Sequence, residues 1–462
     1  MKFRLMILFF VSLAINSRAQ KVDVWLTNAD RSALFEQQKQ SPEFKSNTDQ
    51  HPTIKVAEDT TYQPIDGFGF ALTGGSAMHM IRMSKQSRAA LLKELFATDH
   101  NNIGVSYLRL SIGSSDLNDH VFSYDDLPAG ATDVNLYKFD LGPDKDDVIP
   151  VLKEILAINP NIKILGSPWS APVWMKTNGD TRGGSLKPEY YKAYADYLVK
   201  YIKSMQANGI RIDAITVQNE PLHPGNNPSM YMPADAQTTF VKNNLGPAFK
   251  AAKLNTKIII YDHNADRPDY PDSVLNDPEA RKYIDGSAFH LYRGKIEALS
   301  QVHNANPDKN LYFTEQMVIE RGNARGLNVV SPVERLVVGA TRNWCRNVLE
   351  WNIAAGPDNK PYTDRGGCSI CQGAVTIDAD SVKRNVAYYA IAHASKFVRP
   401  GSVRIASNIP ESLPNVAFKT PSGKKVLIVT NNGPDAQTFN IQYKAKTVQV
   451  SLQSKSVATY IW

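Results

Sequence analysis

The chain has 462 residues, a length that suggests two or three structural units and not one small domain. Hydrophobic residues make up 42% and charged residues 21%, which is ordinary for a folded globular protein and excludes global disorder. The formal net charge is +7, but lysine and arginine are spread thinly along the chain, so no basic stripe for nucleic acid is predicted.

The first nineteen residues have the pattern of a signal peptide. Lys2 and Arg4 precede an apolar stretch, Leu5–Ile15, that is too short to span a bilayer as a stable helix. Ser17 and Ala19 then supply the small residues that a signal peptidase requires. The mature protein is expected to begin near Gln20 and to be exported to the periplasm, the cell surface or the medium. No later stretch predicts a membrane span.

Beyond the signal, strands alternate with helices. Short strands are expected at Val22–Leu26 and Thr53–Val56, with a helical segment near Ser32–Gln40. The eight strands that follow are predicted at Gly67–Phe70, Tyr107–Ile112, Lys163–Gly166, Ala214–Gln218, Lys257–Tyr261, Ser287–Leu291, Asn310–Thr314 and Val348–Trp351. Helices are predicted at Val148–Asn159, Glu189–Ala207, Pro332–Val348 and Arg384–Val398. Eight such units predict an α/β protein with a closed (β/α)8 TIM barrel.

Past Pro400 the apolar residues recur with a period of two, which is typical of strands. The expected strands are Val416–Phe418, Lys425–Thr430, Gln437–Gln442, Thr447–Leu452 and Ala458–Trp462. They predict a small β-sandwich that the N-terminal strands complete, because those strands cannot build a core alone. We therefore expect a signal peptide at 1–19, N-terminal sandwich strands at 20–62, the catalytic barrel at 63–398 and the rest of the sandwich at 399–462.

Two carboxylates stand where a barrel of this type carries its chemistry, at the C-terminal ends of strands. Glu220 follows the fourth predicted strand and Glu315 the seventh. Glycoside cleavage needs a proton donor and either a nucleophile or an activated water, and a pair about 5 Å apart gives retention of configuration. Arg109, inside the second strand, is expected to keep the nucleophilic carboxylate ionised, while burial and the neighbouring negative charge hold the other protonated. An isolated surface glutamate and a structural ion pair are the alternatives for these residues.

Aromatic residues at the same strand ends indicate a sugar site. Trp169 follows the third strand and Trp351 lies at the end of the eighth, while His290 and Tyr292 end the sixth. Sugars present a C–H face that packs on a flat ring, so the two tryptophans are expected to form a platform. A buried core position is the alternative for either tryptophan alone.

The chain contains three cysteines. Cys345 falls in the helix predicted at Pro332–Val348 and is expected to be a buried, inert thiol. The pair Cys368 and Cys371 has the spacing of a tight disulfide, a redox pair or half a zinc site. A second pair of ligands for zinc is lacking nearby, so a loop disulfide is expected.

These residues make the chain resemble glycoside hydrolase family 30, which includes glucosylceramidases and β-1,6-glucanases. The motifs that carry the resemblance are Gly67-Phe68-Gly69, Leu108-Arg109-Leu110, Ser167-Pro168-Trp169-Ser170-Ala171-Pro172, Lys176-Thr177-Asn178-Gly179, Asn219-Glu220-Pro221, Thr314-Glu315-Gln316, Trp351-Asn352 and Ser395-Lys396-Phe397. The resemblance implies that Glu220 is the acid/base, Glu315 the nucleophile and Asn219 the ligand of the sugar 2-hydroxyl. It also implies that Arg109, Trp169, Tyr292 and Trp351 surround the reacting sugar, and that no cofactor or metal is needed.

The resemblance also has departures. Gly74 and Gly75 stand where we expect a glucosylceramidase to bind the outer hydroxyls of glucose with a carboxylate, and Leu291 stands in place of a strand-six tryptophan. The expected substrate is therefore a polysaccharide, a β-glucan, and the leading prediction is a retaining endo-β-1,6-glucanase. The alternatives are an exo-acting β-glucosidase or glucosylceramidase, a β-xylanase or β-galactanase, and a non-catalytic glycan-binding protein. Linkage, endo or exo action and oligomeric state stay open.

Overall fold

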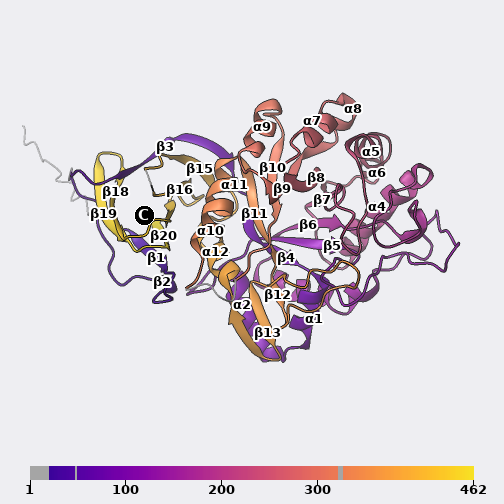
Figure 1. Cartoon of the computed structure of the whole chain (residues 1–462), viewed down its shortest axis with the longest axis horizontal. Helices are drawn as coiled ribbons and strands as arrows, with labels where there is room; N and C mark the ends of the chain where they lie inside the picture. Colours follow the sequence, from indigo (N-terminus) through magenta and orange to yellow (C-terminus); the bar gives the residue numbers. More distant parts are fainter. Residues whose placement is uncertain (1–19, 47–48, 321–325, 411) are drawn as a thin grey trace, which may run out of the picture.

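The structure is a computed structural model that describes residues 20–46, 49–320, 326–410 and 412–462. Two bodies lie side by side, a barrel surrounded by helices and a smaller β-structure at the end where the chain terminates (Figure 1). The predicted signal peptide falls outside the described residues. Among the residues that are described, no helix is both long enough and apolar enough to cross a membrane.

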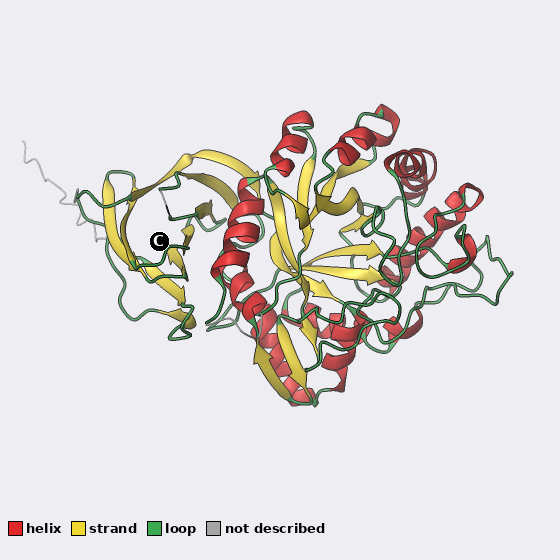
Figure 2. Cartoon of the chain, viewed as in Figure 1, coloured by secondary structure: helices red, strands yellow, loops and turns green. Residues whose placement is uncertain are grey.

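The barrel is closed and all its neighbouring strands pair in parallel (Figure 2). Its strands are β4 (Gly67–Leu72), β5 (Tyr107–Ile112), β6 (Lys163–Pro168), β7 (Ala214–Thr216), β8 (Lys257–Ala265), β9 (Ile284–Gly294), β10 (Asn310–Glu315) and β11 (Cys345–Asn352). The TIM barrel predicted from the alternating pattern is thus confirmed. The strands are almost continuously buried, as parallel strands covered on both faces must be.

The helices lie between and around the strands. The α-helices are α1 (Gly74–Arg82), α2 (Lys85–Phe96), α3 (Val148–Ile158), α4 (Tyr191–Ala207), α5 (Ala234–Phe240), α6 (Gly246–Ala251), α7 (Asp269–Leu275), α8 (Pro278–Arg281), α9 (Ala298–Ala305), α10 (Val330–Pro332), α11 (Gly339–Arg342) and α12 (Val386–Ser395). Short 3-10 turns are η1 (Gly142–Lys145), η2 (Val173–Met175) and η3 (Pro188–Tyr190), and π-helical turns are η4 (Val241–Leu245) and η5 (Val333–Val338). As predicted, α4 stops before Gly209, whose φ of 80° suits a glycine.

The second body is a nine-stranded sheet built from both ends of the chain, as expected. Its order is β19-β18-β3-β15-β16-β17-β20-β1-β2. The strands are β1 (Asp23–Thr27), β2 (Leu34–Gln37), β3 (Thr53–Pro64), β15 (Val403–Ser407), β16 (Asn415–Lys419), β17 (Lys425–Asn431), β18 (Gln437–Tyr443), β19 (Lys446–Leu452) and β20 (Ser456–Ile461). It has its own apolar core, which includes Phe44, Phe439 and Trp462.

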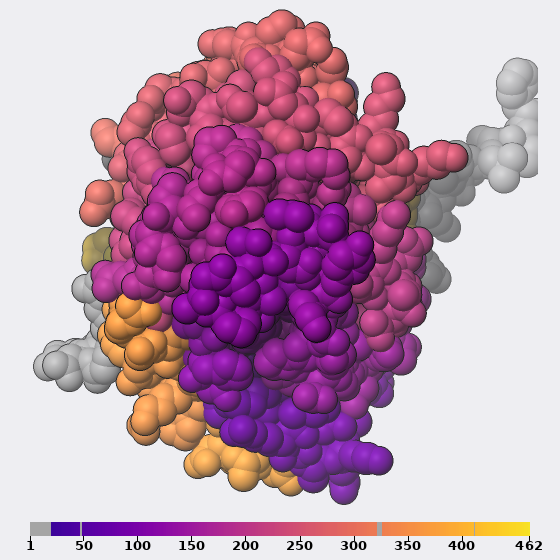
Figure 3. Space-filling model, turned by 90° about the vertical axis from the view of Figure 1, so that its right-hand side faces the viewer, coloured from indigo at the N-terminus to yellow at the C-terminus, as the bar shows by residue number. Residues whose placement is uncertain are grey.

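The loop that follows the barrel's last strand folds back onto the first helices. After β11 come β12 (Ala354–Ala355), β13 (Val375–Asp378) and β14 (Ser381–Arg384), which form a separate three-stranded sheet. Arg384 Nε donates to Glu94 Oε1 of α2 at 2.9 Å. In Figure 3 this orange segment lies against the violet residues of the first helices, although the two are far apart in the sequence.

One expected helix is wrong and another extends too far. The segment near Ser32–Gln40 is the strand β2, because Phe35 has a φ of 53° and its ring packs 4.8 Å from Trp25. The helix predicted over Pro332–Val348 ends at Arg342. Trp344 then takes a φ of 74°, and Cys345 begins β11. Cys345 is nevertheless a buried free thiol, as expected.

Candidate active site

The predicted site residues meet at the C-terminal mouth of the barrel. Arg109 lies within β5, Trp169 just after β6, His290 and Tyr292 on β9, Glu315 at the end of β10 and Trp351 on β11. Asn219 and Glu220 follow β7, which ends earlier than expected. Glu220, Tyr261 and Asp262 take positive φ angles of 44°, 71° and 66°, a conformation that costs free energy in residues other than glycine and is concentrated at functional sites.

Asp262, fully buried at the end of β8, joins most of these groups. Its Oδ2 accepts hydrogen bonds from Arg109 Nη2 at 2.8 Å, and from Ser167 Oγ and Thr216 Oγ1, both at 2.6 Å. Its Oδ1 accepts from Thr314 Oγ1 at 2.6 Å and faces His290 Nε2 at 3.0 Å. Burial raises the pKa of this carboxyl, but Arg109 and then His290 outweigh burial and hold the pKa well below its usual range. Asp262 is therefore a fixed negative charge.

Glu315 accepts a hydrogen bond on each oxygen. Arg109 Nη1 donates to Oε2 at 2.5 Å, and the Tyr292 hydroxyl donates to Oε1 at 2.9 Å. Arg109 and Tyr292 thus fix the position of the Glu315 carboxyl group from two sides. Arg109 also donates to Asn219 Oδ1 at 2.7 Å, which leaves the Asn219 amide N–H groups for another acceptor.

Glu220 is buried beside two histidines. His290 Nδ1 lies 3.2 Å from Glu220 Oε1, and His263 Nδ1 lies 3.7 Å from the same oxygen. Burial raises the pKa of Glu220, but the two histidines more than offset burial and lower the pKa below its ordinary value. Burial likewise lowers the pKa of His290, yet Glu315 and Asp262 bring it up to about 9. The expectation that burial and the neighbouring negative charge hold Glu220 protonated is therefore wrong, because His263 and His290 lower the pKa of this carboxyl group.

The two tryptophans stack on each other beneath the site. Their ring centroids are 5.4 Å apart, and the Arg109 guanidinium lies 4.8 Å from the Trp169 centroid. Trp169 is 1% exposed and Trp351 4%, so protein covers most of both rings. The buried Trp169 Nε1–H has no partner within the described structure. The rings border the cavity, but the open platform stays a prediction.

A cavity of about 320 Å³ opens between Glu220 and Glu315. Trp169, Trp351, Tyr292, Asn226 and Met317 are among the residues that line it, and so is Asp116, which the sequence analysis missed. Burial, and after it the nearby Glu315 and Glu220, raise the pKa of Asp116 to about 8. Asp116 is thus a neutral carboxylic acid at neutral pH.

Asp116 lies on the loop that packs against Gly74 and Gly75, the positions where a carboxylate is lacking. Both glycines begin α1 and pack beneath the loop that carries Asp116. A Cβ at Gly74 would lie 2.1 Å from the Asn118 side chain, and one at Gly75 would lie 2.5 Å from the Leu117 carbonyl. The glycines therefore do not leave the site without a carboxyl group, because Asp116 on that loop supplies one.

Comparisons with known proteins identify the family of this chain. The glycosyl hydrolase family 30 TIM-barrel domain matches residues 65–398, and the β-sandwich domain of the same family matches residues 401–460. The chain belongs to glycosyl hydrolase family 30. It is a glycoside hydrolase, which confirms the predicted family and enzyme class.

Relatives of this family 30 enzyme span nearly its whole length. An endo-1,6-β-D-glucanase of Aspergillus fumigatus is 33% identical over 425 residues, which cover 86% of this chain and 85% of the relative. The solved structure of the endo-β1,6-glucanase BT3312 has a TM-score of 0.88 at 34% identity and covers 96% of this chain and 99% of that one. Lysosomal acid glucosylceramidase of Mus musculus is 28% identical over 442 residues, 88% of this chain and 83% of the relative.

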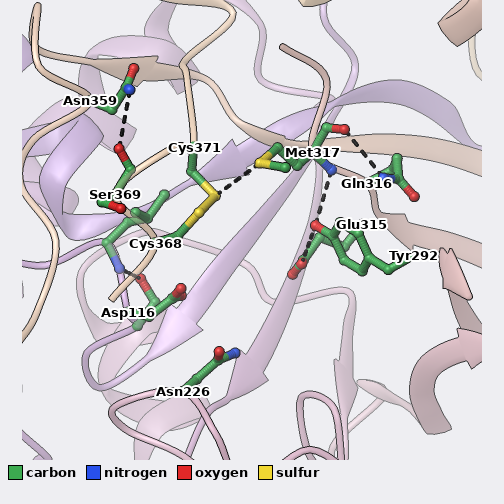
Figure 4. The surroundings of a disulfide bond; sticks show 12 residues. Asp116, Asn226, Tyr292, Glu315, Gln316, Met317, Asn359, Cys368, Ser369 and Cys371 are labelled. Carbon is green, nitrogen blue, oxygen red and sulfur yellow. Dashed lines mark hydrogen bonds between the residues drawn. A yellow bond between two sulfur atoms is a disulfide. The ribbon is translucent and has the colours of Figure 1, made fainter. Parts of the chain in front are cut away.

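The cysteine pair forms a wall of the family 30 site. Cys368 and Cys371 are disulfide-bonded, as expected, and both line the cavity. Figure 4 shows the disulfide facing Met317, whose sulfur lies 3.4 Å from Cys371 Sγ. The Met317 N–H donates to the Tyr292 hydroxyl at 3.0 Å, and that hydroxyl in turn donates to Glu315. A continuous path of contacts thus joins the disulfide to Glu315.

Two site residues on β8 also escaped the sequence analysis. Asp262 and His263 directly follow the apolar run Ile258–Tyr261, where the fifth strand was expected to end. Polar residues immediately after a buried barrel strand were the signal that could have found them. Asp116 had no comparable signal, because it lies in a loop.

Proposed function

We propose that the protein is a retaining endo-β-1,6-glucanase in which Glu315 is the nucleophile and Glu220 the acid/base. The observation that carries the proposal is the pair of buried carboxylates on opposite sides of one cavity. His290 Nδ1 lies 3.2 Å from Glu220 Oε1 and 3.9 Å from Glu315 Oε1. The two oxygens are therefore no farther apart than the sum of these distances, which excludes the upper end of the inverting range, about 9.5 Å.

The first step transfers the sugar to the enzyme. A Glu315 oxygen attacks the anomeric carbon while the bond from that carbon to the leaving oxygen breaks. The leaving oxygen takes the electron pair together with a proton from Glu220. In the second step a water oxygen attacks the same carbon, Glu220 takes a proton from this water, and the ester bond to Glu315 breaks.

The proton for the first step comes from the pair formed by His290 and Glu220. His290 faces Asp262 with Nε2 and Glu220 with Nδ1, so it stores a proton at neutral pH. A bound sugar displaces water from the cavity, and loss of water raises the pKa of a carboxyl group. The proton then moves to Glu220 and from there to the leaving oxygen. His290 acts on the reaction only through Glu220, to which it passes the proton, so it is a positioning residue.

Other polar groups around the reacting sugar can donate hydrogen bonds to its hydroxyl groups. The free amide N–H of Asn219 donates to the 2-hydroxyl, and Trp169 Nε1–H and the neutral Asp116 carboxyl can donate to outer hydroxyls. A larger cavity of about 640 Å³ lies between the loops after β5 and β6 and is lined in part by Trp174 and Tyr190. Ser170, which directly follows Trp169, and Ser114, two residues before Asp116, line it too, so further sugars of a polymer have room nearby.

The roles of the carboxylates are separated by substrates with different leaving groups. Glu315→Ala should abolish turnover of every substrate, because no nucleophile remains. Glu220→Ala should still be glycosylated by substrates with acidic phenol leaving groups, which need little protonation; general acid catalysis contributes about 10²–10⁴-fold otherwise. Burst kinetics on both substrate types measure this, and proton NMR should record the β-anomer first. Equal losses in both variants, or the α-anomer first, would contradict the assignment.

Substrate choice is tested with β-1,6-linked glucan oligosaccharides of increasing length. An endo-acting enzyme draws binding energy from sugars on both sides of the cut, so kcat/KM should rise steeply with chain length and stay low on an aryl β-glucoside. Asp116 favours a second candidate, an exo-acting β-glucosidase or glucosylceramidase, because it can bind a terminal glucose. For that enzyme kcat/KM should not change with oligosaccharide length, and glucose should be the sole early product. This result would reject the endo-β-1,6-glucanase.

The partner is an oligo- or polysaccharide, and the enzyme works outside the cytoplasm. Residues 1–19 act as a signal peptide in this proposal, and N-terminal sequencing of the exported protein should begin near Gln20. A chain that keeps Met1 after export would reject it.

A further inference from the structure

Three buried side chains at the mouth of the barrel have the composition of a metal site. Glu220, His263 and His290 each offer one ligand atom, and these atoms lie within 4.8 Å of one another. Two of the separations, 3.2 Å and 3.7 Å from Glu220 Oε1 to the histidine Nδ1 atoms, are near the spacing of about 3.3 Å between ligands of a tetrahedral zinc ion. Two imidazoles and one carboxylate are also ligands that zinc prefers.

One of the histidines already has the outer partner of a metal ligand. The second nitrogen of His290, Nε2, faces Asp262 Oδ1 at 3.0 Å. Metal-binding histidines usually donate their other N–H to a carboxylate, which orients the ring and makes the ligating nitrogen more basic. Asp262 is fully buried and is held by Arg109, Ser167, Thr216 and Thr314, so this orientation is rigid.

The other histidine has a vacant ligand atom. His263 is 7% exposed, and its Nδ1 makes no hydrogen bond among the described residues. Glu220 Oε1 lies 3.7 Å away, beyond the distance of a hydrogen bond, and a buried polar nitrogen without a hydrogen bond is uncommon in folded proteins. Glu220 and His263 both border the catalytic cavity, so a fourth position next to them is open to water. An open fourth position is the arrangement of zinc sites that exchange ligands.

We propose that Glu220, His263 and His290 form a binding site for a borderline transition-metal ion such as Zn²⁺ or Cu²⁺, which inhibits the enzyme. Hard ions such as Mg²⁺ prefer oxygen ligands and should not compete. A bound metal occupies the Glu220 oxygen and the His290 nitrogen, so neither can pass a proton to the leaving group. Binding stands on geometry alone, whereas inhibition also rests on the proposed role of Glu220.

Isothermal titration of the metal-free protein with ZnCl2 tests the site directly. The native protein should bind one Zn²⁺ per chain, and MgCl2 should produce no heat of binding. His263→Asn removes one ligand and should weaken Zn²⁺ binding at least tenfold. His120→Asn is the matched control, because His120 contacts Asp119 at 2.7 Å in an exposed pair away from the cavity, and it should bind as the native protein does. Unchanged binding in His263→Asn would overturn the site.

Two further measurements keep the test decisive. Circular dichroism establishes that each variant is folded, and Glu220→Gln, which preserves shape but loses the carboxylate, should also weaken Zn²⁺ binding at least tenfold. Zn²⁺ should inhibit hydrolysis by the native enzyme, and EDTA should reverse it. Stoichiometric binding without inhibition would reject the proposed role of Glu220 while supporting the metal site. No binding to the native protein would reject the metal site and leave that role intact.

Discussion

Charge at the active site is balanced within a few buried residues. Arg109 pairs with Asp262 and Glu315, and His290 lies between Asp262 and Glu220. Buried ion pairs of this kind contribute little net stability, because the desolvation of both partners opposes their attraction. We infer that the network is kept for its chemistry, since it places two histidines beside Glu220 and the Arg109 guanidinium and the Tyr292 hydroxyl beside Glu315.

Glu350 on β11 is also buried, but it lies outside this network of paired charges. It is 1% exposed, neither carboxyl oxygen has a partner in the described structure, and burial raises its pKa well above the usual range. Below the pKa of an unfolded glutamate, about 4.3, both states are protonated and ionisation makes no difference to the stability. Above that pH only the unfolded state ionises, so the stability of the native protein falls as pH rises towards the folded pKa.

Glu350→Gln removes this linkage. The variant should be more stable than the native protein at pH 7 and equally stable at pH 3.5. The gain at pH 7 is limited to about 1.4 kcal/mol for each unit by which the folded and unfolded pKa values of Glu350 differ. Urea denaturation at the two pH values measures the difference. A gain in stability that is the same at both pH values would contradict the explanation, because it could not come from ionisation.

The loop between β12 and β13 is the element that links the rim of the cavity to Glu315. Its disulfide contacts Met317, and the path continues through Tyr292 to Glu315 (Figure 4). Because the disulfide closes a loop of only a few residues, the stability that it confers is small, about 2 kcal/mol or less. Its effect should therefore be larger on activity than on folding.

The double variant Cys368→Ser/Cys371→Ser tests this path. Its kcat/KM should fall about tenfold, which is ~1.4 kcal/mol of lost transition-state stabilisation, with most of the loss in kcat. Ile370→Ser keeps the disulfide and changes only the exposed residue between the cysteines, so it should behave as the native enzyme does. A double variant with native kcat would show that the loop does not position Glu315.

At the scale of the whole molecule, α12 connects the barrel to the sandwich. Every residue of this helix is buried, and His393 bridges the two bodies. Its Nδ1 lies 2.9 Å from Thr459 Oγ1 on β20, and its Nε2 lies 2.9 Å from Thr27 Oγ1 on β1. Burial lowers the pKa of His393 to about 3. Since an unfolded histidine titrates near ~6.5, this contact is linked to pH.

The sign of that linkage gives a prediction for acid stability. Above pH ~6.5 His393 is neutral in both states, whereas between 6.5 and 3 only the unfolded state takes up the proton. The native protein should therefore lose up to about 1.4 kcal/mol per pH unit across this window through His393. His393→Gln should be less stable at pH 7.5 but show a shallower loss on acidification. Parallel urea-denaturation profiles from pH 7.5 to 4 would contradict it.

The sequence by itself determined the architecture and the central chemistry of this enzyme. Short apolar strands that alternate with amphipathic helices predict a barrel because burial of both faces leaves few other arrangements. The polar residues that interrupt or follow those strands, Arg109, Glu220, Glu315 and Trp351, could be placed at one mouth for the same reason. Periodicity and strand order are local properties, so they can be read along the chain.

Only the tertiary structure decided how those groups act on one another. Asp116, Asp262 and His263 enter the site through long-range packing, and the direction of the Glu220 pKa depends on two histidines from other strands. The helix expected near Ser32–Gln40 became a strand because Phe35 packs against Trp25, a contact that local propensity cannot record. Desolvation, charge proximity and packing depend on distances through space, and those exist only once the chain has folded.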